Sequence, residues 1–155
     1  MIIGITGRIA NGKSTLSKTK KGLIIELDDI SKEVFEMKKS EILKAFKNIN
    51  KSILRKAVFS SNEALDKLEA IMHPEMKKIL KQKLEVAKKN HKGDIYIIGA
   101  LWKKFEFKKL CDKIIVVRKS KQEAWELLKK RNPEFTKKEF EFVWNRQKEC
   151  FLDKN

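Results

Sequence analysis

The run GRIANGKS at residues 7–14 is the feature that most constrains the fold of this 155-residue chain. It matches the pattern G-x-x-x-x-G-K-S/T in full, and it lies between an apolar, β-branched run at residues 1–5 and a segment typical of a helix start. In such a phosphate-binding loop, glycines let the backbone wrap closely, so that successive N–H groups and a helix N-terminus face phosphate oxygens. We therefore expect a strand–loop–helix unit that binds the phosphates of a nucleotide.

Two side chains of this loop carry the expected chemistry. Lys13 would neutralise the β and γ phosphates of ATP, and the hydroxyl of Ser14 would hold Mg²⁺, the one cofactor that we expect. The predicted ATP ligands are Gly7, Ala10, Asn11, Gly12, Lys13, Ser14, Thr15 and, from the C-terminal part of the chain, Arg146. The motif by itself does not separate kinases from motor ATPases or GTPases.

Short apolar runs elsewhere predict the rest of a sheet. Residues 23–27, 95–98 and 114–117 are rich in β-branched side chains and are too short for helices. Such runs are typical of strands that are buried on both faces of a parallel sheet. Together with residues 1–5 they predict about four parallel strands.

The remaining segments predict helices. Apolar side chains between residues 31 and 92 recur largely at helical spacing, and Pro74 is expected to begin a new helix after His73. Residues 121–130 and 137–151 predict two further helices on either side of a loop.

These elements indicate the α/β class, in a three-layer α/β/α arrangement of the P-loop type with a short parallel sheet, a helical substrate-binding region and a lid. We expect one kinase domain over residues 1–155. Its parts would be a core of residues 1–30 and 93–120, a helical acceptor region at about 31–92 and a lid at about 121–147.

The position of the next acidic residues separates small-molecule kinases from motor ATPases. Motors carry a carboxylate at the end of a later apolar strand, whereas residues 99–101, which follow the third strand, hold none. Asp28 and Asp29 instead follow the second strand, which we expect to lie beside the first. Asp28 would then receive or orient the acceptor hydroxyl. Its alternative role is to cap a helix that begins near Ile30, and for Asp29 capping or solvent exposure is the favoured interpretation.

Phosphoryl transfer also needs cations around the transferred group. The candidates are Lys129, Lys130, Arg131 and Arg146. Arg131 and Arg146 are preferred because a guanidinium binds phosphate in a bidentate fork, and a plain surface charge is the alternative for each.

The net charge of +16 raises the question of a polyanionic partner. Lysines, however, occur in almost every segment, so they indicate a solvated basic surface and disfavour a nucleic-acid partner. Only Cys111 and Cys150 are present, which is too few for a disulfide framework and fits a reducing compartment. No signal peptide or membrane span is evident, so we expect a cytoplasmic protein without a membrane partner.

Four segments resemble the dephospho-coenzyme A kinase family. They are IIGITGRIANGKST, IIELDDISKEVF, the pair INKSILRKAVF and LDKLEAIMHPEMKKIL, and residues 111–117 followed by Gln122 and later by Arg146 and Gln147. The resemblance extends over most of the chain, and its most specific feature is the His-Pro step at His73 and Pro74.

The resemblance implies transfer of phosphate from ATP to the ribose 3′-hydroxyl of dephospho-coenzyme A, which gives coenzyme A. It places Asp28 at the position of the family's catalytic aspartate, with Glu26 as the other acid of the pair. Together with the residues singled out above, the predicted catalytic residues are Asp28, Lys13 and Arg131. Asp28, Arg55 and His73 would bind the acceptor, although His73 could instead only pack or cap a helix.

The chain departs from the family pattern at three places. Arg8 stands where the family has a glycine, residues 99–103 replace the family's Pro-Leu-Leu-x-Glu, and the stretch between Val34 and Ile49 is about ten residues shorter than in the family. Two alternatives therefore stay open, namely a nucleoside or nucleotide kinase with another acceptor, and a degenerate nucleotide-binding protein.

Overall fold

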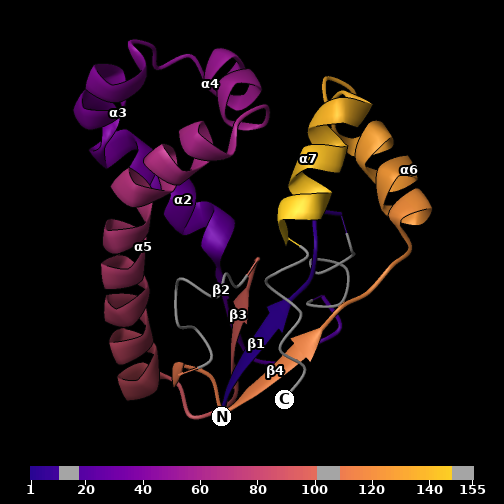
Figure 1. Ribbon diagram of the computed structural model, residues 1–155. Helices are drawn as coiled ribbons and strands as arrows, with labels where there is room; N and C mark the ends of the chain where they lie inside the picture. Colours follow the sequence, from indigo (N-terminus) through magenta and orange to yellow (C-terminus); the bar gives the residue numbers. More distant parts are fainter. Residues whose placement is uncertain (11–17, 101–108, 148–155) are drawn as a thin grey trace. The chain divides into compact units, whose positions relative to one another are not determined.

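A computed structural model describes residues 1–10, 18–100 and 109–147 of the chain. Four parallel strands make one sheet in the order β2-β3-β1-β4 (Figure 1). Their bounds are Ile2–Thr6 for β1, Leu23–Glu26 for β2, Ile95–Ile98 for β3 and Lys113–Val116 for β4. The α/β class and the short parallel sheet predicted from the sequence are confirmed.

The helices of the described part keep the labels of Figure 1, from α2 to α7. They are α2 (Leu27–Met37), α3 (Lys39–Phe46), α4 (Lys51–Val58), α5 (Asn62–Asn90), α6 (Lys121–Arg131) and α7 (Lys137–Gln147). The chain divides into two compact units, of which the second is Asp28–Lys83 and the first holds the described residues before and after it.

Strand β1 is the centre of the first unit. It is hydrogen-bonded to β3 on one side and to β4 on the other, and all five of its residues are buried. Its register pairs Ile3 with Tyr96 and Ile5 with Ile98, so alternate side chains of the two strands share one face and pack there in a buried cluster. The β-branched composition of these runs therefore reflects burial on both faces of the sheet.

The expected position of β2 beside β1 is wrong, because β3 lies between them. A crossover connection between parallel strands passes over a face of the sheet, so it can leave room for a strand that comes later in the sequence. The carboxyl ends of β1 and β2 are thus two strand spacings apart, roughly 9–10 Å.

The expected start of a new helix at Pro74 is also wrong. Helix α5 runs from Asn62 to Asn90 with Pro74 inside it. Proline removes one backbone hydrogen bond and crowds the preceding turn, so it bends a helix that packing holds on both sides. Met72 and Met76 are buried on either side of Pro74, and Figure 1 shows that α5 changes direction along its length.

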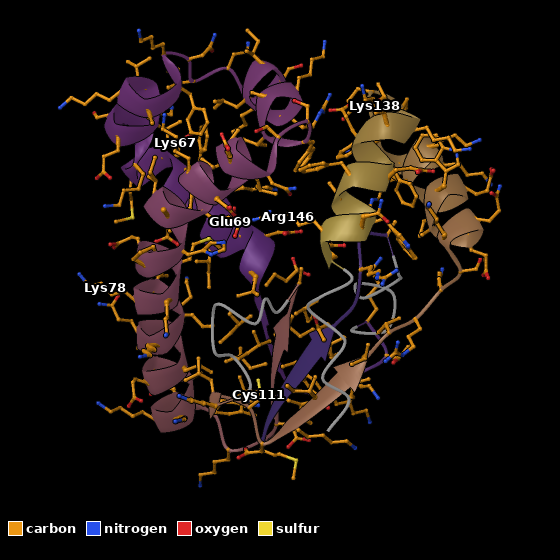
Figure 2. All side chains as sticks on the ribbon, in the orientation of Figure 1. Lys67, Glu69, Lys78, Cys111, Lys138 and Arg146 are labelled. Atoms are coloured by element: carbon orange, nitrogen blue, oxygen red, sulfur yellow. The ribbon has the colours of Figure 1, made fainter. Side chains whose placement is uncertain are left out.

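The second unit is held by contacts between its helices. Lys67 of α5 donates a 2.9 Å hydrogen bond to the carbonyl oxygen of Ala45, near the end of α3, and its ammonium lies 5.4 Å from the centre of the Phe46 ring (Figure 2). A cation is favoured at this place because the carbonyl end of a helix carries partial negative charge. Asn50 then starts α4, its side-chain oxygen accepting from the N–H groups of Ser52 and Ile53.

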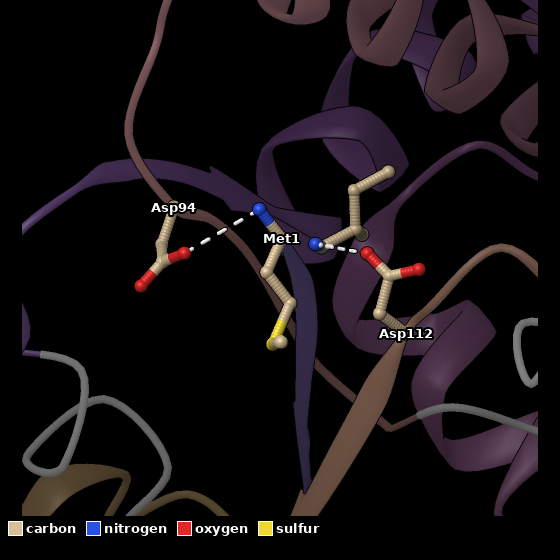
Figure 3. Close-up of polar contacts among 4 residues, drawn as sticks. Met1, Asp94 and Asp112 are labelled. Carbon is tan, nitrogen blue, oxygen red and sulfur yellow. Dashed lines mark hydrogen bonds and ion pairs between the residues drawn. The ribbon is translucent and has the colours of Figure 1, made fainter.

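The amino terminus of β1 is fixed by two carboxylates (Figure 3). Asp112 accepts a 2.7 Å hydrogen bond from the Ile2 N–H, and the Asp112 N–H donates in return to the Ile2 carbonyl at 2.7 Å. Asp94 lies 3.4 Å from the terminal amine of Met1, and both of these side chains are about half exposed. The reciprocal pair aligns β4 with β1 from the first residue of the strand.

Helices α6 and α7 pack against the segment that follows β1. Ala10 belongs to a buried apolar cluster whose other members are Ala124, Leu128, Phe140 and Trp144. The Phe140 ring lies between Trp125 and Trp144, with centroid distances of 5.3 and 5.6 Å. Ala10 has φ 56°, a left-handed conformation that costs an alanine roughly 1–2 kcal/mol. Packing in this cluster holds it there.

We expect Asp112→Ala to lower the free energy of unfolding by about 1 kcal/mol, because the Ile2 N–H loses its acceptor in a partly buried place. Asp94→Ala is the matched control and should change it by less than about 0.5 kcal/mol, since exposed ion pairs contribute little. Urea denaturation measures both values, and equal effects would contradict the role given to Asp112.

We expect Ala10→Val to lower the free energy of unfolding by about 2–3 kcal/mol, because a β-branched side chain at positive φ is strained and overfills the cluster. Ala10→Gly, which accepts this φ without strain, is the control and should cost less. Thermal and urea unfolding of the three proteins decides the point. A valine variant as stable as the glycine variant would rule out this account.

Candidate active site

The phosphate-binding motif begins at the carboxyl end of β1, where open α/β sheets bind their ligands. Of the predicted ATP ligands, Gly7, Ala10 and Arg146 lie in the described part of the chain. Asn11, Gly12, Lys13, Ser14 and Thr15 lie outside the described residues. Thr6 and Ala10 are 3% and 5% exposed, so the backbone on both sides of Gly7 is enclosed by protein.

The C-terminal end of α7 contacts the start of this loop. The Ile9 N–H donates a 2.5 Å hydrogen bond to Oε1 of Gln147, and the Arg8 guanidinium lies 4.6 Å from the centre of the Trp144 ring. Gln147 and Trp144 are both buried. The sequence offered a single hint of these contacts, the unusual Arg8, because they join residues far apart in the chain.

The two preferred arginines lie at opposite ends of the hairpin made by α6 and α7. Arg131 is the last residue of α6; it is exposed, and its Nε donates to the Asn132 side chain at 3.4 Å. Arg146 comes immediately before Gln147, and its Nε is shielded from solvent (Figure 2). Figure 1 shows α6 and α7 running in opposite directions, so the length of α7 separates the two residues by roughly 14 Å. The structure therefore places only Arg146 near the loop.

Asp28 lies one residue after the start of α2 at Leu27. The interpretation of Asp28 as the cap of a helix beginning near Ile30 is wrong, because Asp28 and Asp29 both lie within the first turn. Both residues are exposed. Negative charge is favoured at this end of a helix, so the turn presents an acidic surface directly after β2.

Arg55 and His73, the other predicted acceptor residues, lie on α4 and α5 of the second unit and are both half-buried. His73 Nδ1 is 3.8 Å from a carboxylate oxygen of Glu69, one helical turn earlier. Glu69 is only 8% exposed, and a carboxylate is rarely buried without partners. A buried carboxylate, that of Glu69, therefore lies beside the His-Pro step, and the sequence alone assigned it no role.

Cys111 is a free, half-buried cysteine. Burial, and then the charge of Asp112, raise the pKa of its thiol to about 11, so the thiol stays protonated at neutral pH. Within residues 1–10, 18–100 and 109–147, no group of three or more His, Cys, Asp or Glu side chains could hold a metal ion. No helix in that same part of the chain combines the length and apolar character needed to cross a membrane.

Comparison with solved structures supports the fold. A crystal structure titled TT1252 from Thermus thermophilus superposes with a TM-score of 0.74 at 24% identity, covering 95% of this chain and 80% of that one. A dephospho-CoA kinase from Campylobacter jejuni gives a TM-score of 0.53 at 23% identity over 94% of this chain and 78% of that one. At these identities the likeness shows the fold alone.

Comparison with sequences shows the family. The model of the family described as dephospho-CoA kinase matches residues 1–149. A dephospho-CoA kinase of Borreliella burgdorferi is 37% identical over 100% of this chain and 80% of its own length. A second dephospho-CoA kinase, from Borrelia garinii, is 40% identical over 76% of this chain. That match covers 62% of the Borrelia garinii protein, which is less than two thirds of its length. The chain belongs to the dephospho-CoA kinase family of ATP-dependent phosphotransferases.

Proposed function

We propose that this chain transfers the γ-phosphoryl group of ATP to the ribose 3′-hydroxyl of dephospho-CoA and so forms coenzyme A. The observation that carries the proposal is the family match over residues 1–149, which includes both the phosphate-binding motif and the His-Pro segment. The acceptor oxygen attacks the γ-phosphorus, the bond to the β–γ bridging oxygen breaks, and ADP leaves.

Binding of ATP is assigned to the loop after β1 and to the end of α7. Gly7 and Ala10 start the loop, Lys13 neutralises the β and γ phosphates, and Arg146 lies one residue from a contact with the loop. The motif supplies one hard oxygen ligand for Mg²⁺, the hydroxyl of Ser14, which suits an ion that is mostly held by substrate phosphates. Bound Mg²⁺ would neutralise charge on those phosphates.

Asp28 is proposed to accept the proton of the attacking hydroxyl. Its support is its position directly after β2 on an exposed first helical turn, where a substrate can reach the carboxylate. Arg55 and His73 are proposed to bind the acceptor from the second unit, His73 being steadied by the Glu69 carboxylate one turn away.

We propose that α6 and α7 form the lid over the nucleotide. Arg131 would act on the transferred phosphate only after a movement of the hairpin, since it lies at the end away from the loop. We also propose a cytosolic location, which fits the ATP-dependent family and the free thiol of Cys111.

The acceptor is tested by ATP consumption of the purified protein with Mg²⁺, with dephospho-CoA compared against nucleosides and nucleoside monophosphates. We expect stimulation by dephospho-CoA alone. Stimulation by a nucleoside or nucleotide would keep the kinase chemistry and replace the acceptor, while no stimulation would leave a nucleotide-binding protein without transferase activity.

We expect Lys13→Ala to cut turnover by at least about 10²- to 10³-fold, because one charged donor to the developing transition state is lost. Lys138→Ala, an exposed lysine on α7, is the matched control and should leave turnover unchanged. Steady-state rates with saturating ATP and dephospho-CoA give the comparison. Normal turnover of the Lys13 variant would remove its assigned role.

We expect Asp28→Asn to lower kcat by about 10²- to 10⁴-fold with ATP affinity nearly intact, because a general base acts in the transition state and not in nucleotide binding. Asp29→Asn, in the same helical turn, is the control and should be near wild type. Calorimetric ATP affinity and kcat are measured together. A large loss of ATP affinity, or equal effects of both variants, would assign Asp28 to metal binding or to structure.

A further inference from the structure

Residues 8–10 of the phosphate-binding loop are held by α7 at three consecutive positions. Arg8 lies over the Trp144 ring, Ile9 donates its N–H to Gln147, and Ala10 packs in the buried cluster that includes Trp144. All of these residues belong to the first unit. The end of α7 therefore touches every residue between Gly7 and the undescribed part of the motif.

The Gln147 hydrogen bond fixes the direction of the loop backbone. Gln147 is 6% exposed, and a buried amide side chain is held in place by the partners it finds. Because the Ile9 N–H points at Gln147, the peptide plane at Ile9 is set by α7 and not by phosphate. The orientation of the following N–H groups, on which phosphate binding depends, starts from that plane.

The chemistry of the side chain suits this place. An amide oxygen accepts the backbone hydrogen bond without net charge, whereas a carboxylate would accept it equally well but repel the phosphates. Arg8, on the next residue, has its guanidinium on an aromatic face and so ties the loop to the same helix.

We propose that Gln147 is a positioning residue of the phosphate-binding loop, and that Arg8 with Trp144 supports it, so that ATP affinity depends on α7 side chains that do not contact the nucleotide. The inference rests on the proposed function for its kinetic readout, but ATP binding alone tests it. Arg8 is then not a phosphate ligand, although it lies within the motif.

The main test is Gln147→Met, which keeps the length and volume of the side chain and removes the amide acceptor. We expect the Kd and KM for ATP to rise about tenfold, equivalent to ~1.4 kcal/mol, while the KM for the acceptor changes less than about twofold. Gln122→Met, an exposed glutamine on α6, is the matched control and should match wild type. Calorimetry without acceptor and steady-state kinetics give these values.

A merely structural role has a different signature. It would lower the fraction of active protein, so that calorimetric stoichiometry and apparent kcat fall while the Kd for ATP stays at the wild-type value, and this result would overturn the proposal. If wild type binds ATP but phosphorylates no dephospho-CoA, the proposed function fails, while the Kd comparison still decides the role of Gln147.

A double-mutant cycle tests the second contact independently of the stability of the Gln147 variant. Arg8→Ala and Trp144→Leu are each expected to weaken ATP binding. The double variant should bind ATP about as well as the weaker-binding single variant, because each substitution removes the same Arg8–Trp144 interaction. Strictly additive losses would overturn the part given to Arg8 and Trp144.

Discussion

The central position of β1 is the constraint on which the rest of the first unit depends. Strand β1 is hydrogen-bonded to β3 and β4 on its two sides and all five of its residues are buried, so most of them are apolar. The strand delivers residues 7–10 to the carboxyl edge of the sheet. Asp112 fixes the other end of the strand through reciprocal hydrogen bonds with Ile2. A shift of one residue in this register would exchange the two faces of the strand, so the same pairing sets both the core and the place of the loop.

The sequence predicted what local chemistry decides. The apolar β-branched runs became β1, β2, β3 and β4 within about a residue. Burial on both faces explains this composition for β1 and β3. The expectation of such burial is wrong for β2 and β4, because these edge strands are partly exposed. The order of the strands in the sheet could not be predicted from these runs, because the composition of a strand does not determine which strand lies beside it. Pro74 was taken for a helix start because proline is common there, but buried residues on both sides kept α5 continuous.

The candidate site divides in the same way between local and long-range information. The loop motif and the acids after β2 are patterns of neighbouring residues, so they could be read directly. The Ile9–Gln147 bond and the Glu69–His73 pair could not, although for different reasons. The first joins distant parts of the chain. Glu69 and His73 have helical spacing, but the burial of Glu69, which makes the pair notable, depends on tertiary packing.

The aromatic contacts between α6 and α7 limit how Arg131 could serve the proposed reaction. Trp125, Phe140 and Trp144 lie in tilted ring contacts that join the two helices around a buried cluster, so we expect the hairpin to move as one piece. Arg131 lies at its far end and the contacts with residues 8–10 lie at its near end. A lid movement that brought Arg131 to the phosphates and preserved those contacts would have to turn about them. The side chains that we propose to orient the loop would then also form the pivot of the proposed lid.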